Sequence, residues 1–225
     1  MSKRTLVTRI SEYVDIISHI RLLKQILSEG GYLAESGWKK SQWDRKHTVM
    51  DRDGSNIPWL TYPFISFIEP RLTKTMDVFE YGCGYSSVWW ADKCRTLTAV
   101  ESVQEWIDIV QDRTKSNSNI KLLYANEKHE FCEMPEKTDK KYHIIIVDQA
   151  DDMDRNMALK LAVNYLTSDG VVILDDSERT AYTEGKSYLN ANGFKELRFV
   201  GLASTISYYG KTTAVFYRDE NVLGI

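Results

Sequence analysis

The stretch DVFEYGCGYSS, residues 77–87, decides how the rest of the sequence is interpreted. An apolar run ends at Glu80, two glycines follow at Gly82 and Gly84, and a helical pattern begins at Ser86. Glycines at this spacing let the backbone turn sharply and approach a ligand, because no Cβ stands in the way. The first helical amides then lie within reach of a polar group. The stretch predicts a buried parallel strand that ends at a nucleotide, although a strand-to-helix turn without a ligand has the same pattern.

A second carboxylate, Glu101, closes the next apolar run, TLTAVE. At the tip of the neighbouring strand it could accept both hydroxyls of a ribose. The dinucleotide fingerprint G-x-G-x-x-G requires a third glycine where this sequence has Ser87, which argues against a nicotinamide cofactor.

Apolar runs alternate with amphipathic segments through the rest of the chain, which predicts a parallel sheet with helices on both faces. Further strands are expected at 96–101, 120–124, 142–148, 170–175, 195–200 and 212–218, and helices at 86–93, 103–115, 128–134, 154–166 and 180–192. The last two strands are too close for a helical crossover, so they should be antiparallel. We therefore predict an α/β, Rossmann-like fold with a mostly parallel seven-stranded sheet whose last strand is reversed.

The N-terminal segment carries a different pattern. Apolar residues recur at three- and four-residue steps over residues 6–27, which predicts an amphipathic helix. This helix packs on the domain or, alternatively, forms a homodimer or lies on a membrane surface. A polar linker that contains aromatic residues follows. We expect a helix and aromatic cap over residues 1–56 and a catalytic domain over residues 57–225.

Composition limits the possible partners. The 225 residues carry a net charge of −3 with acids and bases interspersed, so we expect no nucleic acid partner. The three cysteines are odd in number and lack metal-binding spacing, which fits a reducing compartment. Because the sequence has neither an apolar run of about 20 residues nor the apolar core of a signal peptide, we expect a cytoplasmic protein without a membrane span.

The pattern Glu80-x-Gly82-x-Gly84 resembles the first motif of class I S-adenosylmethionine (SAM) methyltransferases. That resemblance implies SAM as the cofactor and a sheet with a reversed final strand. The blocks GSNIPWLTYPF, ILDDSER and TTAVFYR are similar to a group of bacterial methyltransferases assigned to surface-glycan or secondary-metabolite pathways. This similarity implies the hydroxyl of a small molecule or carbohydrate as the methyl acceptor.

Ligands of such a sheet lie outside the carboxyl ends of the strands. The resemblance assigns the following residues to SAM: Glu80, Tyr81, Gly82, Cys83, Gly84, Ser86, Ser87, Glu101, Ser102, Asn126 and Asp148. Asn126 would meet the adenine amino group, although asparagine after a strand is equally typical of a turn. We expect Trp59, Tyr62 and Arg179 on the acceptor side; the two aromatic residues would serve equally well as core anchors.

Three carboxylates, Asp148, Asp175 and Asp176, are expected at adjacent strand tips. Like charges brought together there favour a divalent cation such as Mg²⁺. The positions are similar to those of the metal-dependent catechol-type O-methyltransferases, in which the metal acidifies the acceptor hydroxyl. The lysine that those enzymes carry just after the strand-four acid is absent here, since Gln149 and Ala150 follow. Alternatively, Asp175 or Asp176 caps a helix and Asp148 orients SAM.

Without a metal, a side chain must take the proton of the acceptor. Candidates are His129, His47, Asp151 and Asp176, and we favour His129 because histidine titrates near neutrality. The predicted catalytic residues are thus Asp148, Asp176 and His129. Two other functions remain open from the sequence: an NAD(P)-dependent oxidoreductase, and a non-catalytic protein that binds SAM or a partner.

Overall fold

The computed structural model describes residues 16–28, 49–51, 53–150, 152–203 and 211–225. The chain divides into two compact units, Met1–Ser55 and Asn56–Ile225. In the first unit, residues 16–27 are helical, within the predicted helix, and expose five apolar side chains: Ile16, Ile17, Ile20, Leu22 and Leu23. A homodimer through this helix stays a prediction, as do the roles assigned to residues 1–56 and 57–225.

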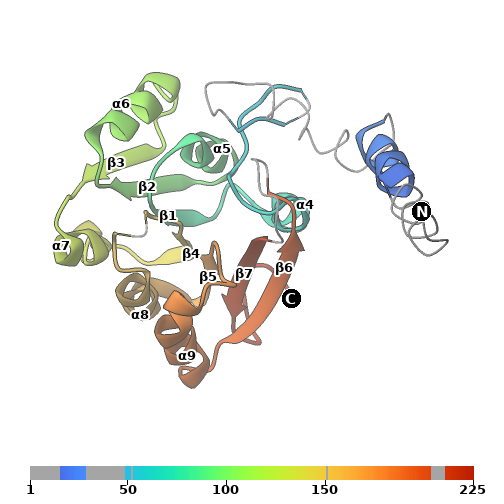
Figure 1. Ribbon diagram of the computed structural model, residues 1–225. Helices are drawn as coiled ribbons and strands as arrows, with labels where there is room; N and C mark the ends of the chain where they lie inside the picture. Colours follow the sequence, from blue (N-terminus) through green and yellow to red (C-terminus); the bar gives the residue numbers. More distant parts are fainter. Residues whose placement is uncertain (1–15, 29–48, 52, 151, 204–210) are drawn as a thin grey trace, which may run out of the picture. The chain divides into compact units, whose positions relative to one another are not determined.

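The second unit is built on a seven-stranded sheet in the order β3-β2-β1-β4-β5-β7-β6 (Figure 1). The strands are β1 (Asp77–Tyr81), β2 (Thr96–Glu101), β3 (Ile120–Tyr124), β4 (Tyr142–Val147), β5 (Leu166–Leu174), β6 (Lys195–Gly201) and β7 (Lys211–Tyr217). Strands β1 to β5 pair in parallel, whereas β7 is antiparallel to both β5 and β6. The predicted mostly parallel sheet with a reversed last strand is confirmed.

Helices cover both faces of the sheet, as predicted. They are α4 (Tyr62–Ile68), α5 (Tyr85–Lys93), α6 (Gln104–Arg113), α7 (Lys128–Cys132), α8 (Arg155–Tyr165) and α9 (Thr183–Ala191). Figure 1 shows α4, α5 and α6 on one face and α7, α8 and α9 on the other. Strand β4 is central and covered on both sides, which is why its sequence YHIIIV is an almost continuous apolar run.

Two element boundaries differ from the predicted ones. Strand β5 begins at Leu166 because α8 turns directly into the sheet, where Tyr142 pairs with Leu166 before the register shifts. Gly170 lies at this irregularity, and a Cβ there would come within 2.9 Å of the Tyr142 carbonyl oxygen. The helix expected over 180–192 is divided into a 3-10 turn, Thr180–Tyr182, and α9. Within the described segments, no helix is long and apolar enough to cross a membrane.

Candidate active site

Backbone hydrogen bonds join the strand ends into one continuous edge. The Gly82 amide donates to the Val100 carbonyl at 2.9 Å, and the Asp148 amide donates to the Tyr81 carbonyl at 3.1 Å. In the same way, the Asp175 amide donates to the Val147 carbonyl at 3.2 Å. The residues that follow β1, β2, β4 and β5 therefore lie side by side, where a ligand of a parallel α/β sheet binds.

The two glycines after β1 have different roles. Gly82 has a φ of +89°, and a Cβ on it would lie 2.9 Å from both the Asp148 carbonyl oxygen and the Gln149 Cα. Because it lacks a side chain, Gly82 can adopt this positive φ and pack closely against the residues that follow β4. Gly84 precedes α5, and among the described residues a Cβ there would meet no atom within 4 Å apart from its own chain neighbours. Gly84 borders open space into which a ligand could fit.

Glu80 fastens this turn to α5 from inside the protein. Its fully buried carboxylate accepts hydrogen bonds from the hydroxyls of Ser86, at 2.6 Å, and Ser87. The Ser87 hydroxyl in turn accepts a hydrogen bond from the Gly84 amide at 3.1 Å. Burial raises the pKa of Glu80 from 4.5 to about 7, against the opposing effect of the two serines. Glu80 therefore shapes the loop from below.

Glu101 fixes the same loop from β2. Its Oε2 accepts a hydrogen bond from the Cys83 amide at 3.0 Å, and its Oε1 accepts from the amides of Ser102 at 2.7 Å and Val103 at 2.9 Å. Among the described residues, Oε2 has that single bond, which leaves it a lone pair for a ligand hydroxyl. Asn126 is exposed at the same edge, beyond β3.

Two predicted cofactor residues contribute only backbone to this edge. The Tyr81 side chain is fully buried and donates its hydroxyl hydrogen to the Cys132 carbonyl at 2.7 Å. The Cys83 thiol is buried as well, and burial raises its pKa far above the ordinary thiol range. The Cys83 thiol is therefore unsuited to act as a nucleophile.

Asp148 lies directly after β4, with 21% of its side chain exposed. Burial and the nearby Asp175 raise the pKa of Asp148 well above the usual aspartate range, with Arg155 opposing them. Arg155 lies 3.5 Å from Asp148 Oδ1 and donates to the carbonyls of Gln149 at 2.8 Å and Asp175 at 2.9 Å. This buried guanidinium ties the tips of β4 and β5 together.

The other two acids are paired with Lys211, a residue that the sequence reading did not select. Its Nζ lies 2.5 Å from Asp175 Oδ2 and 3.3 Å from Asp176 Oδ1. Asp176 has a φ of +52°, an uncommon conformation that aspartate tolerates better than most residues. No group of three His, Cys, Asp or Glu side chains in the described segments is arranged to hold a metal. The Mg²⁺ prediction is not supported, because an ammonium already binds these carboxylates.

Of the three residues predicted to contact the methyl acceptor, two lie beside the carboxylates and one lies in the core. Trp59 is 51% exposed, and its carbonyl accepts a hydrogen bond from Lys211 at 3.1 Å, which places it beside the carboxylates. Arg179 lies 2.6 Å from Asp176 Oδ2 and belongs to the same cluster. Tyr62 is buried, as expected for a core anchor.

The histidine candidates are not brought to this edge. The side chain of His129 is 73% exposed on α7, with Nδ1 2.9 Å from Glu133 Oε2 one helical turn away, and no described contact links it to the aspartates. His47 and Asp151 lie outside the described residues. Of the three predicted catalytic residues, Asp148 and Asp176 follow β4 and β5, whereas His129 lies on α7.

Sequence reasoning missed Arg155, Lys211 and Gln149. Two of them had a weak signal in the sequence: Arg155 opens a helix just after an acidic run, and Lys211 is a charged residue that begins a buried strand. Gln149 is only 1% exposed, and its two side-chain amide atoms have no hydrogen-bond partner in the described chain. Natural proteins seldom leave such groups unpaired, so Gln149 is a candidate ligand contact.

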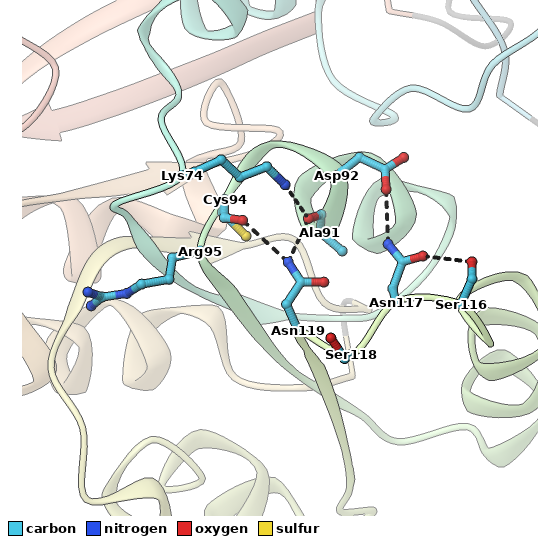
Figure 2. Close-up of a pocket in the computed structure, with 9 residues that line it drawn as sticks. All are labelled: Lys74, Ala91, Asp92, Cys94, Arg95, Ser116, Asn117, Ser118 and Asn119. Atoms are coloured by element: carbon cyan, nitrogen blue, oxygen red, sulfur yellow. Dashed lines mark hydrogen bonds between the residues drawn. The ribbon is translucent and has the colours of Figure 1, made fainter.

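A separate polar depression lies at the opposite edge of the sheet (Figure 2). Lys74, Arg95 and Asn119 line it, and these residues come just before β1, β2 and β3. Asn119 donates to the carbonyls of Ala91 and Cys94, so its amide serves the local structure. The depression contains none of the predicted site residues.

No protein-family model and no curated protein matches the chain. Solved structures do resemble it. An rRNA methylase from Streptococcus thermophilus has a TM-score of 0.56 and 14% identity, covering 72% of this chain and 99% of that chain. For precorrin-6y C5,15-methyltransferase from Geobacter metallireducens the TM-score is 0.55 and the identity 14%, covering 78% and 97%.

A Streptococcus mutans protein in complex with S-adenosylhomocysteine (SAH) has a TM-score of 0.54 and 13% identity, covering 70% of this chain and 99% of that chain. This chain has the class I methyltransferase fold. At such low identity the likeness establishes the fold alone, and the neighbours' acceptors remain properties of those proteins.

Proposed function

We propose that the protein is a SAM-dependent methyltransferase that transfers a methyl group to a hydroxyl of a small molecule or sugar. The observation that supports this most directly is the loop after β1, held from below by Glu80 and from the side by Glu101, with open space beside Gly84. The amides of Gly82, Cys83 and Gly84 are all bonded within the protein, which makes the turn rigid. A rigid turn that has no side chain at Gly84 and leads directly into the first turn of α5 suits a polar cofactor.

The residues at the edge fit SAM. Glu101 retains a lone pair for a ribose hydroxyl, and Asn126 is exposed where the adenine would lie. Ser86 and Ser87 act through Glu80, so they would shape the methionine end of the site and not bind it with their hydroxyls. When bound, SAM would supply the electrophilic methyl group of its sulfonium.

Asp148 is the base that the geometry favours. It lies directly after β4, next to the loop from Gly82 to Gly84, and its raised pKa makes it a stronger proton acceptor than an ordinary aspartate. The role of Asp148 would be to take the proton of the acceptor hydroxyl as its oxygen is methylated. Trp59 offers an exposed ring on which a sugar or aromatic acceptor could stack.

The proposal is tested in two stages. Calorimetric titration of the purified protein with SAM and with NAD⁺ should show binding of SAM; binding of NAD⁺ alone would instead support the oxidoreductase alternative. A panel of amino sugars and aminophenols, which carry both hydroxyl and amino groups, should then give an O-methyl product by NMR with ¹³C-methyl SAM. An N-methyl product would contradict the hydroxyl assignment and leave the cofactor assignment intact.

A further inference from the structure

The ammonium of Lys211 lies where the sequence predicted a divalent cation. Lys211 begins β7, is only 8% exposed, and reaches three oxygens: Asp175 Oδ2 at 2.5 Å, Asp176 Oδ1 at 3.3 Å and the Trp59 carbonyl at 3.1 Å. The contact with Trp59 is a hydrogen bond, and the contacts with Asp175 and Asp176 are ion pairs within the protein interior. The oxygens come from the loop after β5 and from the segment before α4. Because Lys211 itself begins β7, its ammonium joins three parts of the chain.

The remaining carboxylate oxygens of the pair also face donors. Asp175 Oδ1 accepts a hydrogen bond from the Thr213 hydroxyl at 3.0 Å, and Asp176 Oδ2 lies 2.6 Å from Arg179. Asp148, at the next strand tip, lies 3.5 Å from Arg155. The three aspartates are thus matched by three cationic side chains. A cluster with balanced charge gives a divalent cation little electrostatic gain.

A divalent cation would have to displace this ammonium. Magnesium needs carboxylate oxygens and waters in a near-octahedral shell, and it would compete for the two oxygens that Lys211 contacts. It would also leave a buried ammonium unpaired beside a dication, which is strongly unfavourable. The side chains present therefore do not fit a metal.

We infer that Lys211 is a positioning residue whose ammonium takes the place of a divalent cation, holding Asp175 and Asp176 at the acceptor edge. The part of this inference that concerns catalysis rests on the proposed function, and it requires methyl transfer to proceed without added metal. The part that concerns cation binding can be tested without SAM or an acceptor.

The test is Mn²⁺ titration followed by electron paramagnetic resonance, with wild type, Lys211→Met, Lys211→Arg and Lys186→Met. Lys186 is a matched control because its ammonium, close by on α9, donates to the Ser177 carbonyl at 2.7 Å. Lys211→Met should gain one Mn²⁺ site at millimolar or tighter affinity, and adding Asp176→Asn should abolish it. The wild type, Lys211→Arg and Lys186→Met should gain none.

A wild-type Mn²⁺ site that Asp176→Asn removes would overturn the inference, as would a folded Lys211→Met variant that binds no Mn²⁺. If circular dichroism shows that Lys211→Met does not fold, Lys211→Gln replaces it, and the wild-type titration decides independently. With an active enzyme, EDTA should leave the rate unchanged; a loss that Mg²⁺ restores would also overturn the inference. Failure to bind SAM would count against the proposed function alone.

Discussion

At the scale of single residues, the carboxylates at the carboxyl ends of the strands differ in burial, in hydrogen bonding and in pKa because their surroundings differ. Glu80 is buried under the loop that follows β1, Glu101 accepts hydrogen bonds from backbone amides, and Asp148 is partly exposed with a raised pKa. The sequence placed all of them at strand tips, because an acid that closes an apolar run is visible in one dimension. Their partners were not predictable in the same way, because the whole of α9 and β6 separates Lys211 from Asp175 in the sequence.

Glu80 should make stability depend on pH. Since burial raises its pKa from 4.5 to about 7, the folded chain holds a proton over this interval that the unfolded chain releases. The free energy of unfolding should therefore fall as pH rises from 4.5 through about 7, by ~3 kcal/mol in all from this group. Urea denaturation across this range should show a shallower fall in Glu80→Gln, whereas the exposed control Glu105→Gln should follow wild type. Equal slopes in all three would refute the prediction.

The ionisation of Asp148 should determine how kcat/KM depends on pH on the acidic side of the profile. If it is the base, it must be ionised, so kcat/KM should rise with pH through a point above the ordinary aspartate pKa of about 4. Asp148→Asn should lower the rate by about 10²- to 10⁴-fold and remove this rise. Asp152→Asn, a neighbouring exposed aspartate, is the control. An unchanged profile in Asp148→Asn would exclude Asp148 as the base.

At the scale of elements, the turn between β1 and α5 joins fold and site. The sequence indicated it correctly, since an apolar run followed by two glycines and a helical pattern has few structural solutions. It did not show that Gly82 is needed for packing on the Asp148 carbonyl while Gly84 borders open space. Element ends were less predictable for the same reason: β5 begins early because of its pairing with Tyr142, a contact distant in sequence.

Gly82→Ala should destabilise the fold more than Gly193→Ala. Both glycines have positive φ, +89° and +82°, so both variants pay for the left-handed backbone. Only at Gly82 would the new Cβ meet backbone atoms at 2.9 Å. We expect the free energy of unfolding to fall by about 1 kcal/mol in Gly193→Ala and by about 2 to 4 kcal/mol in Gly82→Ala. Chemical denaturation measures both, and equal losses would show that the close approach at Gly82 is unimportant.

At the scale of the whole molecule, the alternation of strands and helices was enough to predict the fold, including the reversed β7. Function follows less directly, because one fold serves many reactions and the acceptor depends on side chains that tertiary structure brings together. The metal prediction shows the difference: three acids at neighbouring strand tips suggested a cation, and only the folded chain revealed Lys211 between two of them.

Calorimetric titration of SAM into wild type, Gly84→Ala and Ser118→Val directly tests whether the loop from Gly82 to Gly84 binds the cofactor. A Cβ at Gly84 meets no atom of the described residues beyond its chain neighbours, so this variant should fold normally and intrude only on the bound cofactor. Ser118 lies by the depression at the opposite edge and is the control. We predict SAM binding by wild type and Ser118→Val, and a loss of about tenfold or more in Gly84→Ala. A wild-type protein that does not bind SAM, or equal affinity in Gly84→Ala, would contradict the assignment of this loop as the cofactor site.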